Sequence, residues 1–294
     1  MKVKTFRVII LIRNLSYLLF IFGLISSCAN TSEKEQKNTS KKIENPTNKV
    51  LLSSEFEWEQ LNPARGDQSP QAGTIWGDRN GTVPTGFLAK FVDGFSSPPH
   101  IHNVTYRAVV IKGFVHNDDP KAENMWMPIG SFWTQPVGEA HITSTKGEEV
   151  IAYVEIDNGP YLVKPIEEAF DSGERPVNIH ASNVVWLNYE KTNWIDPDTK
   201  VQISFLWEGR DKLKGLFIKL PKGFSGEIKS DGDIFHAIVV SGQLKYNMRE
   251  TEESKLLDAG SYFKSAGDAI HTVQNTLEHE VLIYLRTNGE IRIE

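Results

Sequence analysis

The chain has 294 residues, of which 39% are hydrophobic and 10% aromatic, a net charge of −6 and a single cysteine. This acidic balance excludes a broad basic surface for nucleic acid, and one cysteine excludes an intrachain disulfide. The length is sufficient for two domains, each with its own hydrophobic core.

Residues 1–27 have the pattern of an exported protein's signal peptide. Four basic residues, with no acidic ones, precede an apolar run at 15–25, which is too short to span a membrane. The run ends at Ser26-Ser27-Cys28 and resembles a bacterial lipobox, which implies that Cys28 is acylated and becomes the first residue of the mature protein. The alternative is an ordinary signal peptide with an incidental cysteine.

Acylation at Cys28 would anchor the protein to a membrane, because several acyl chains hold a protein stably where one does not. We therefore expect a lipid-anchored protein of the bacterial cell envelope. Asn30, rather than an aspartate, lies two positions after the cysteine, which favours the outer membrane, on either its periplasmic or its surface face.

Residues 28–50 are polar, mixed in charge and free of aromatic side chains. Such a segment cannot bury enough apolar surface to fold, so it is expected to be a disordered tether. Removal of residues 1–27 leaves 28 basic and 38 acidic side chains, a net charge of −10.

Beyond the tether, short runs rich in β-branched and aromatic residues alternate with turn residues. No stretch has a convincing helical period, which predicts an all-β sandwich, jelly roll or barrel. The expected strands are 86–91, 106–111, 131–135, 150–156, 214–220, 234–240, 244–248, 261–264 and 281–286, and a helical turn is expected at 167–172.

The chain contains an internal duplication. Residues 86–94 (GFLAKFVDG) are matched by residues 215–223 (GLFIKLPKG), and later glycines follow at a similar offset. The duplication predicts an N-terminal barrel at 51–164, a linker at 165–178 and a C-terminal barrel at 179–294.

Three histidines of the first copy have the spacing of a metal site. His100 and His102 project from the same face of one expected strand, since side chains alternate along a strand. His141 follows the turn residues Pro136 and Gly138. Three imidazoles that meet inside a barrel would leave coordination positions open on a divalent metal such as zinc, iron(II) or manganese.

These glycine-framed histidines resemble the two motifs of the cupin superfamily. The matching positions are Gly94, His100, His102, Gly113, Gly130, Pro136, Gly138 and His141. The chain departs from the motifs at Tyr106, where cupins have a glutamate, and at Thr145, where they have an asparagine. The resemblance covers about residues 55–294 and implies a bicupin, that is, two tandem double-stranded β-helix barrels.

A narrower resemblance is to the ChrR-like cupin domains of zinc anti-sigma factors and their bicupin relatives. It depends on Trp76-Gly-Asp, on the histidine pair and on the segment Gly130-Ser-Phe-Trp-Thr-Gln-Pro-Val-Gly-Glu-Ala-His141. This resemblance implies a fold and one metal ion, but no substrate.

Three neutral imidazoles leave the charge of a divalent ion uncompensated, which suits a small anionic, oxygen-containing ligand. Iron(II) would favour chemistry like that of three-histidine cupin dioxygenases, and zinc would favour hydrolysis or lyase chemistry. The other hypothesis is a metal-binding or ligand-binding lipoprotein, or a sensor, without turnover. Either way, the expected partners are a small molecule and the membrane.

Tyr106 is the candidate catalytic residue. Its phenol is a poor metal ligand, so we expect it to donate a hydrogen bond inside the pocket; the alternative is a core aromatic residue. Further polar candidates for the pocket are Gln135, Glu139 and Thr143.

The second copy has lost the histidine pair. The glycine spacing aligns Lys229 and Asp231 with the two lost histidines, and Phe235 with Tyr106, so this barrel is expected to be degenerate and metal-free. Lys229 and Asp231 would share one strand face and pair with each other. His271 is interpreted as a vestige of the site. This barrel would serve as a scaffold or as a homodimer surface.

Two further histidines are interpreted as structural. His116 is expected in a solvated loop, and His236 is expected to face solvent or the other sheet. The tripeptide Arg65-Gly66-Asp67 is interpreted as a turn.

Overall fold

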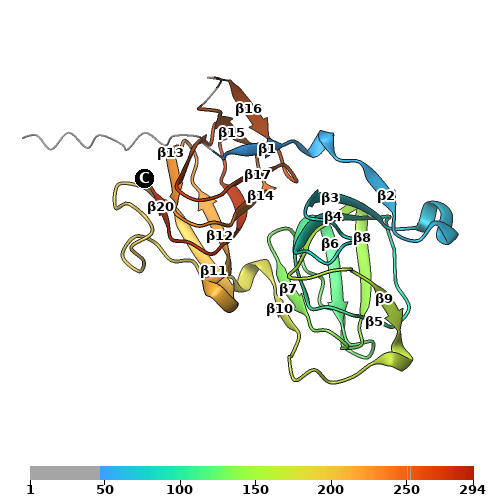
Figure 1. The fold of residues 1–294 in the computed structure, drawn as a ribbon. Helices are drawn as coiled ribbons and strands as arrows, with labels where there is room; N and C mark the ends of the chain where they lie inside the picture. The colour runs from blue at the N-terminus through green and yellow to red at the C-terminus, as the bar shows by residue number, and fades with distance from the viewer. Residues whose placement is uncertain (1–46, 250, 252) are drawn as a thin grey trace, which may run out of the picture. The chain divides into compact units, whose positions relative to one another are not determined.

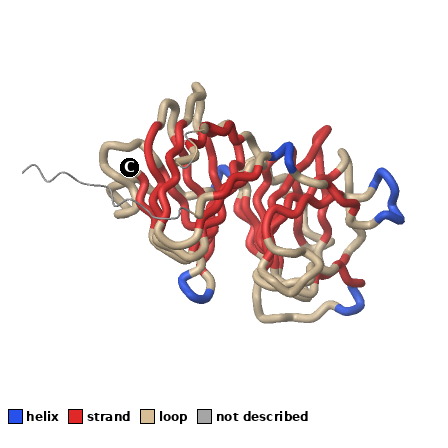
Figure 2. Tube along the Cα trace, turned by 45° about the horizontal axis from the view of Figure 1, so that its top comes forward, coloured by secondary structure: helices blue, strands red, loops and turns tan. Residues whose placement is uncertain are grey.

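The computed structural model describes residues 47–294 except 250 and 252, and almost all of its regular structure is β-strand (Figures 1 and 2). The all-β class expected from the sequence is therefore confirmed. The predicted signal peptide, Cys28 and most of the tether lie outside the described residues. Within the described part of the chain, no helix is long and apolar enough to cross a membrane.

The first barrel is built on a seven-stranded sheet in the order β10-β7-β6-β8-β4-β3-β2, and β5 pairs with β9 in a two-stranded sheet. The strands are β2 (Trp58–Gln60), β3 (Gln71–Trp76), β4 (Thr85–Phe91), β5 (His100–His102), β6 (Tyr106–Asp118), β7 (Phe132–Gln135), β8 (Ile142–Ile156), β9 (Val163–Pro165) and β10 (Val177–Ile179).

The second barrel has a six-stranded sheet, β1-β17-β14-β19-β12-β11, and a five-stranded sheet, β16-β15-β18-β13-β20. The strands are β1 (Lys49–Leu51), β11 (Gln202–Glu208), β12 (Lys214–Leu220), β13 (Ser225–Ser230), β14 (Phe235–Ser241), β15 (Leu244–Asn247), β16 (Ser254–Leu257), β17 (Tyr262–Ser265), β18 (Ala269–Gln274), β19 (Val281–Thr287) and β20 (Ile291–Ile293).

The helical turns are short 3-10 segments between strands: η1 (Ser53–Glu55), η2 (Pro63–Gln68), η3 (Ile166–Glu168), η4 (Ala181–Asn183) and η5 (Arg210–Lys212). The turn expected at 167–172 is thus present as η3, one residue earlier and shorter. Arg65-Gly66-Asp67 lies within η2 and is exposed.

Two strands lie outside the sequence of the barrel with which they pair. β1 pairs antiparallel with β17 of the second barrel, although the chain continues from it into the first. β10, within the segment between the barrels, pairs with β7 of the first barrel. The second barrel therefore includes a strand that precedes the first barrel, and the first barrel includes a strand from the segment between the two.

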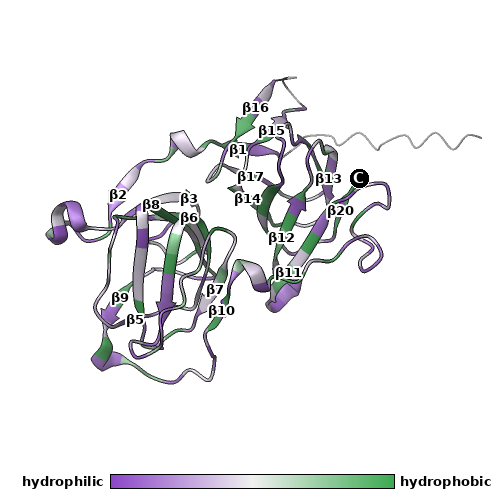
Figure 3. Ribbon diagram, turned by 180° about the vertical axis from the view of Figure 1, so that it is seen from behind, coloured by the Kyte–Doolittle hydropathy of each residue, from purple (hydrophilic) through white to green (hydrophobic). Residues whose placement is uncertain are grey.

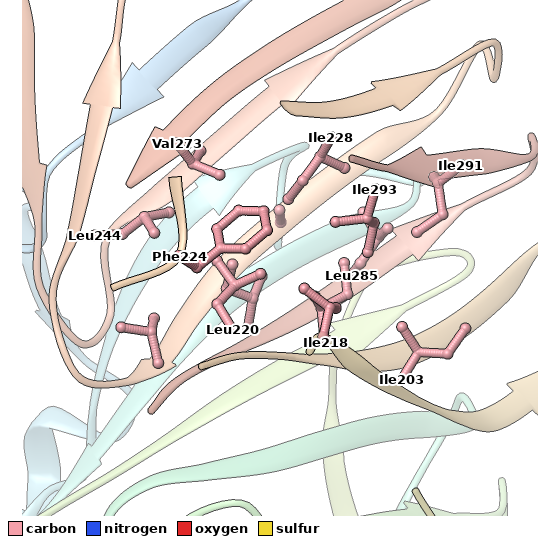
Figure 4. Close-up of a cluster of buried hydrophobic side chains, with 14 of the residues drawn as sticks. Ile203, Ile218, Leu220, Phe224, Ile228, Leu244, Val273, Leu285, Ile291 and Ile293 are labelled. Atoms are coloured by element: carbon pink, nitrogen blue, oxygen red, sulfur yellow. The ribbon is translucent and has the colours of Figure 1, made fainter. Parts of the chain in front are cut away.

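Alternation along the strands divides the apolar residues between two environments, and Figure 3 shows both hydrophobic and hydrophilic residues along the strands of each barrel. In β12, Leu216, Ile218 and Leu220 belong to the core of the second barrel. Phe217, which lies between them in sequence, belongs to a separate cluster. Figure 4 shows Ile218 and Leu220 beside Phe224 in the barrel core.

That separate cluster is shared by both barrels. It contains Leu88 and Val109 of the first barrel and Phe217 and Ile238 of the second, all buried. Because β12 is buried on both faces, its sequence is a nearly continuous apolar run rather than a strict alternation.

Polar groups at the same contact form hydrogen bonds in both barrels. Trp76 donates to the Tyr153 hydroxyl, and Trp207 donates to the Tyr284 hydroxyl, at 3.1 and 2.9 Å. Tyr284 also donates to the fully buried Glu155 across the contact, at 2.7 Å.

A buried ion pair joins the two barrels. Arg286 of the second barrel lies 3.3 Å from Glu155 and 2.8 Å from Asp157 of the first. The side chains of Glu155 and Arg286 are 0% and 3% exposed, so each charge depends on its partners for stabilisation.

Two expectations about histidines are decided by this fold. His236 does face the other sheet, since its ring stacks on Trp76 of the first barrel with centroids 4.4 Å apart. The expectation of a solvated His116 is wrong. β6 continues to Asp118, seven residues beyond its expected end at Ile111, so His116 lies in a strand, 1% exposed and near the ring of Trp126.

Candidate metal centre

The three histidines of the first barrel converge in the structure. His100 and His102 lie on β5, and His141 immediately precedes β8. The backbones of His100 and His141 exchange two hydrogen bonds of 3.0 Å, which places the two side chains next to each other. One ring nitrogen from each histidine lies within 4.8 Å of the other two, and all three residues are buried.

Backbone carbonyl groups orient each ring. The Nδ1 atoms of His100, His102 and His141 lie 2.9, 3.1 and 3.3 Å from the carbonyl oxygens of Pro98, Leu162 and Glu139. A carbonyl can only accept, so each Nδ1 carries the proton and each Nε2 keeps its lone pair. This tautomer with an anchored second nitrogen is the usual arrangement of metal-binding histidines.

Burial also keeps the rings uncharged. It lowers the pKa of His100 and, together with the neighbouring histidines, lowers that of His102 well below the ordinary value. Burial, assisted by the charge of His100, lowers the pKa of His141 to about 3. Neutral imidazole is the form that binds a metal, so no proton needs to be displaced near neutral pH.

Tyr106 lies at the start of β6 beside these rings and is 3% exposed. Its hydroxyl donates to Oδ1 of Asn117 at 3.0 Å, accepts from Nε1 of Trp133 at 3.4 Å and lies 3.5 Å from Nε2 of His141. Burial raises the pKa of Tyr106, so the phenol stays protonated. It can therefore act as a hydrogen-bond donor but not as a base.

A small polar network supports Tyr106. Asn117 accepts a second hydrogen bond, from the Thr143 hydroxyl at 2.8 Å, and donates to Gln135 at 2.9 Å. Two of the further polar candidates, Gln135 and Thr143, thus belong to the site. Glu139 contributes its backbone carbonyl, which accepts from Gln135.

Tyr161 was not anticipated from the sequence. Its ring stacks on His102 with centroids 4.5 Å apart, and its hydroxyl lies 3.3 Å from Nε2 of the same histidine. Asn117 was also missed. Tyr161 lies in the segment that leaves the barrel after β8, outside any motif. Asn117 follows His116, for which the sequence predicts a loop, but both lie in β6.

The second barrel has an apolar interior at the corresponding place. The strand register pairs Ile228 with His271, as His100 pairs with His141, so the counterparts of His100 and His102 are Ile228 and Ser230. The expected counterparts, Lys229 and Asp231, are wrong by one residue.

An extra residue in the first barrel explains the shift. Ser97 pairs with Thr143, and His100 pairs with His141. The first segment therefore advances three residues, from 97 to 100, while the segment opposite advances two, from 143 to 141. The segment with the extra residue contains Pro98 and Pro99. In the second barrel, β13 and β18 pair residue by residue, without an extra residue on either strand.

Lys229 and Asp231 do not form the expected pair with each other. Lys229 forms salt bridges with Glu227 and Glu294, and the Asp231 carboxylate accepts from the backbone of Glu290 at 2.8 Å. The register explains this, because the alternation that points Ile228 into the core points Lys229 away from it.

His271 of the second barrel has both ring nitrogens occupied by protein groups. Asn48 and Tyr246 contact its Nδ1 at 3.3 and 2.7 Å, and Ser265 contacts its Nε2 at 3.0 Å. Burial lowers the pKa of His271 to about 3, so it is a neutral, hydrogen-bonded core residue.

A cavity of about 600 Å³ opens next to the histidines of the first barrel. Its walls are largely apolar and aromatic, and the described residues that line it include no aspartate or glutamate. Its polar and ionisable lining residues include Arg65, Arg79, His100, His102, Tyr106 and Tyr161.

Comparison with known families places this site in context. Residues 49–294 match the family model described as "Domain of unknown function (DUF4437)". The chain belongs to this DUF4437 family. A search of curated proteins gave no match.

Solved structures share the fold at low sequence identity. This DUF4437 chain is similar to a putative dioxygenase from Nostoc punctiforme, with a TM-score of 0.64, 11% identity and 82% of each chain covered. It is also similar to salicylate 1,2-dioxygenase from Pseudoaminobacter salicylatoxidans, solved as adducts with gentisate (0.54, 12%, 85% of each chain). Oxalate decarboxylase from Lactobacillus farciminis, in a formate complex, has a TM-score of 0.54 and 10% identity over 86% of this chain and 88% of its own.

These likenesses confirm two cupin barrels. Within this fold, His100, His102 and His141 are the group of described residues that could hold a metal ion.

Proposed function

We propose that this DUF4437 chain is a metal-dependent, dioxygenase-like enzyme that acts on a small oxygen-containing molecule. The observation that carries the proposal is a centre of three neutral histidines, two of which, His100 and His102, line a largely apolar cavity whose described lining includes no carboxylate. Two of the similar structures are described as dioxygenases, which supports the same class of reaction.

The hydrolytic alternative would depend on water activated by the metal itself, because the described lining offers no carboxylate as a general base. Tyr106 stays protonated because burial raises its pKa, and the histidines would serve as ligands. Iron(II) held by Nε2 of His100, His102 and His141 would supply the binding of dioxygen and of substrate oxygens at its open positions.

The protein's own residues would hold the metal ligands in place and shield the reacting groups from water. The carbonyl-anchored rings fix the geometry of the ligands, and aromatic walls exclude water from the reacting groups. Tyr106 provides a hydroxyl 3.5 Å from Nε2 of His141, within reach of a group bound beside that ligand. If its proton turned from Asn117 toward the cavity, this hydroxyl would stabilise negative charge that develops on substrate oxygen.

A second candidate function is binding without turnover, as in a carrier or a sensor. The Tyr106 hydroxyl is already satisfied by Asn117 and Trp133, which favours a structural role for it. The resemblance of the sequence to ChrR-like cupin domains of zinc anti-sigma factors, which implies a metal ion but no substrate, agrees with this candidate.

Metal analysis followed by oxygen uptake tests the proposal. Purified protein is expected to hold about one metal ion per chain, and the variant His100→Ala with His102→Ala should hold none. His279→Ala, which changes an exposed histidine of the second barrel, is the matched control and should keep the metal. Two ions per chain, or an ion retained in the double variant, would refute the site.

Turnover is then measured as oxygen consumption by iron-loaded protein with catechols, diketones and thiols. Uptake that disappears in the double variant supports the dioxygenase. Stoichiometric metal and ligand binding without turnover of any tested compound would favour the carrier.

We further propose that the enzyme is tethered to the bacterial envelope through acylated Cys28, facing either side of the outer membrane. Metabolic labelling with a fatty acid is expected to mark the wild type and not Cys28→Ser. Equal fractionation of both proteins with membranes would argue against lipidation.

A further inference from the structure

Besides its neutral histidines, the cavity of the first barrel has positively charged side chains in its lining. Arg65 and Arg79 both line it, and the described lining residues include no acidic side chain to balance them. The guanidinium of Arg65 lies over the ring of Phe95, 5.2 Å from its centroid. The histidines are buried, whereas Arg65 belongs to the exposed η2 turn, so the cavity runs from a cationic rim to a buried metal centre.

Arg79 is the more informative of the two arginines. Its side chain is only 11% exposed, and its Nη2 bonds Glu59 at 2.8 Å. Glu59 is 66% exposed, so this pair is open to solvent on the carboxylate side and is weakly stabilising. Among the described residues, the buried Nε of Arg79 has no hydrogen-bond partner.

A buried guanidinium N–H without a partner is costly unless another group accepts from it. Arg79 lies close to the centre, because its carbonyl accepts from the backbone of Tyr161 at 3.1 Å and Tyr161 stacks on His102. Arg79 also lines the cavity, so its positive charge is available to an anion bound there, near the metal ligands.

We propose that the cavity binds a carboxylic acid with an apolar or aromatic body, whose carboxylate is held by Arg79 and whose other end reaches the three histidines. The carboxylate pairs with the Arg79 guanidinium, whose charge is otherwise balanced only by the exposed Glu59, and Arg65 supplies a second positive charge at the rim. Phe87, Phe91 and Phe95 provide the apolar wall between the two ends. This assignment rests on the proposed function, because it uses the metal centre as the second point of attachment.

The test uses zinc-loaded full-length protein, so that binding is measured without oxidation. The probes are dihydrocaffeate, which carries a catechol and a carboxylate, and propylcatechol, which has a methyl group in place of the carboxylate. Calorimetry is expected to show dihydrocaffeate binding about tenfold tighter or more, as for a hydrogen-bonded ion pair.

In Arg79→Gln the preference for dihydrocaffeate should disappear, while the affinity for propylcatechol stays within about twofold of wild type. Arg175→Gln removes an exposed arginine outside the cavity lining and should keep the full preference. Glu59→Gln provides a second measurement that leaves Arg79 in place, in case Arg79→Gln fails to fold. Because Glu59 no longer competes for Arg79 in this variant, the preference for dihydrocaffeate over propylcatechol should increase.

Equal affinities of the two probes for the wild type, or a preference that survives in Arg79→Gln, would overturn the carboxylate site. A preference that falls in Glu59→Gln would do the same. If zinc binds at one ion per chain but neither catechol binds, the carboxylate site is refuted and the metal site stands. If zinc does not bind to the histidines, the proposed function fails, and this inference fails with it.

Discussion

Replacement of Tyr106 by phenylalanine separates a chemical role of this residue from a structural one. The change removes a single hydroxyl from a 3% exposed side chain and leaves its ring in place. Metal content should not change, because the phenol is not among the three ligands and each histidine ring keeps its carbonyl anchor.

The cost in stability follows from the hydrogen bonds of the hydroxyl. Its bond to Asn117 at 3.0 Å is lost, but Asn117 keeps the bond from Thr143 at 2.8 Å and is not left without a donor. The buried Nε1–H of Trp133 also loses its acceptor, at 3.4 Å. At about 1 kcal/mol for each neutral hydrogen bond, the two together cost about 2 kcal/mol. In a protein of this size, the melting temperature should therefore fall by roughly 4–8 °C.

The effect on turnover should be much larger if the hydroxyl stabilises charge in the transition state. Loss of one such donor slows a reaction by roughly 100-fold or more. Steady-state oxygen uptake, metal analysis and thermal melting on the same two protein preparations give all three quantities. Turnover that falls by no more than threefold, in a variant with normal metal content, would remove Tyr106 from the mechanism.

Three further changes test other parts of the structure. Tyr106→Glu restores the carboxylate of the cupin motif and should tighten metal binding in a chelator competition; unchanged affinity would mean that this position does not reach the metal. Arg286→Met leaves Glu155 as a buried charge with one ionic partner fewer and should cost about 3–5 kcal/mol in chemical denaturation, much of which Glu155→Gln should restore. Burial lowers the pKa of His271 and of His236 to about 3, against about 6.5 in an unfolded chain. The unfolded state therefore binds more protons between these values, so metal-free protein should lose about 1.4 kcal/mol per histidine for each pH unit below about 6; a His271→Gln variant with the same pH dependence as wild type would contradict this.

Much of the candidate site followed from local rules. Two histidines with one residue between them must share a strand face, and glycines at fixed spacing set the turns around them. The convergence of His141 on this pair followed from the match to the cupin motifs, which encode the pairing of two strands. The sequence could therefore predict the ligand geometry without a view of the whole barrel.

The errors have equally local causes. The counterparts of the lost histidines were misplaced because an extra residue before His100 shifts one strand without moving the flanking glycines. A one-residue shift reverses which face a side chain occupies. This is why Lys229 was expected in the interior, where Ile228 lies instead.

Long-range contacts could not be predicted from spacing. Tyr161 contacts His102 from a segment 59 residues later that has no regular pattern. Strands such as β13, with the sequence SGEIKS, have too few apolar residues to stand out, although partners on both sides hold them in the barrel.

The exchange of strands at the barrel margins determines how the chain can be divided. A gene cut between the two copies would give a first half that carries β1, the edge strand of its partner, as an unpaired segment, and a second half without it. The second half would also lack Asn48, which contacts the buried ring of His271. The second barrel therefore keeps its edge strand only in the intact chain, which joins the two copies as one folding unit.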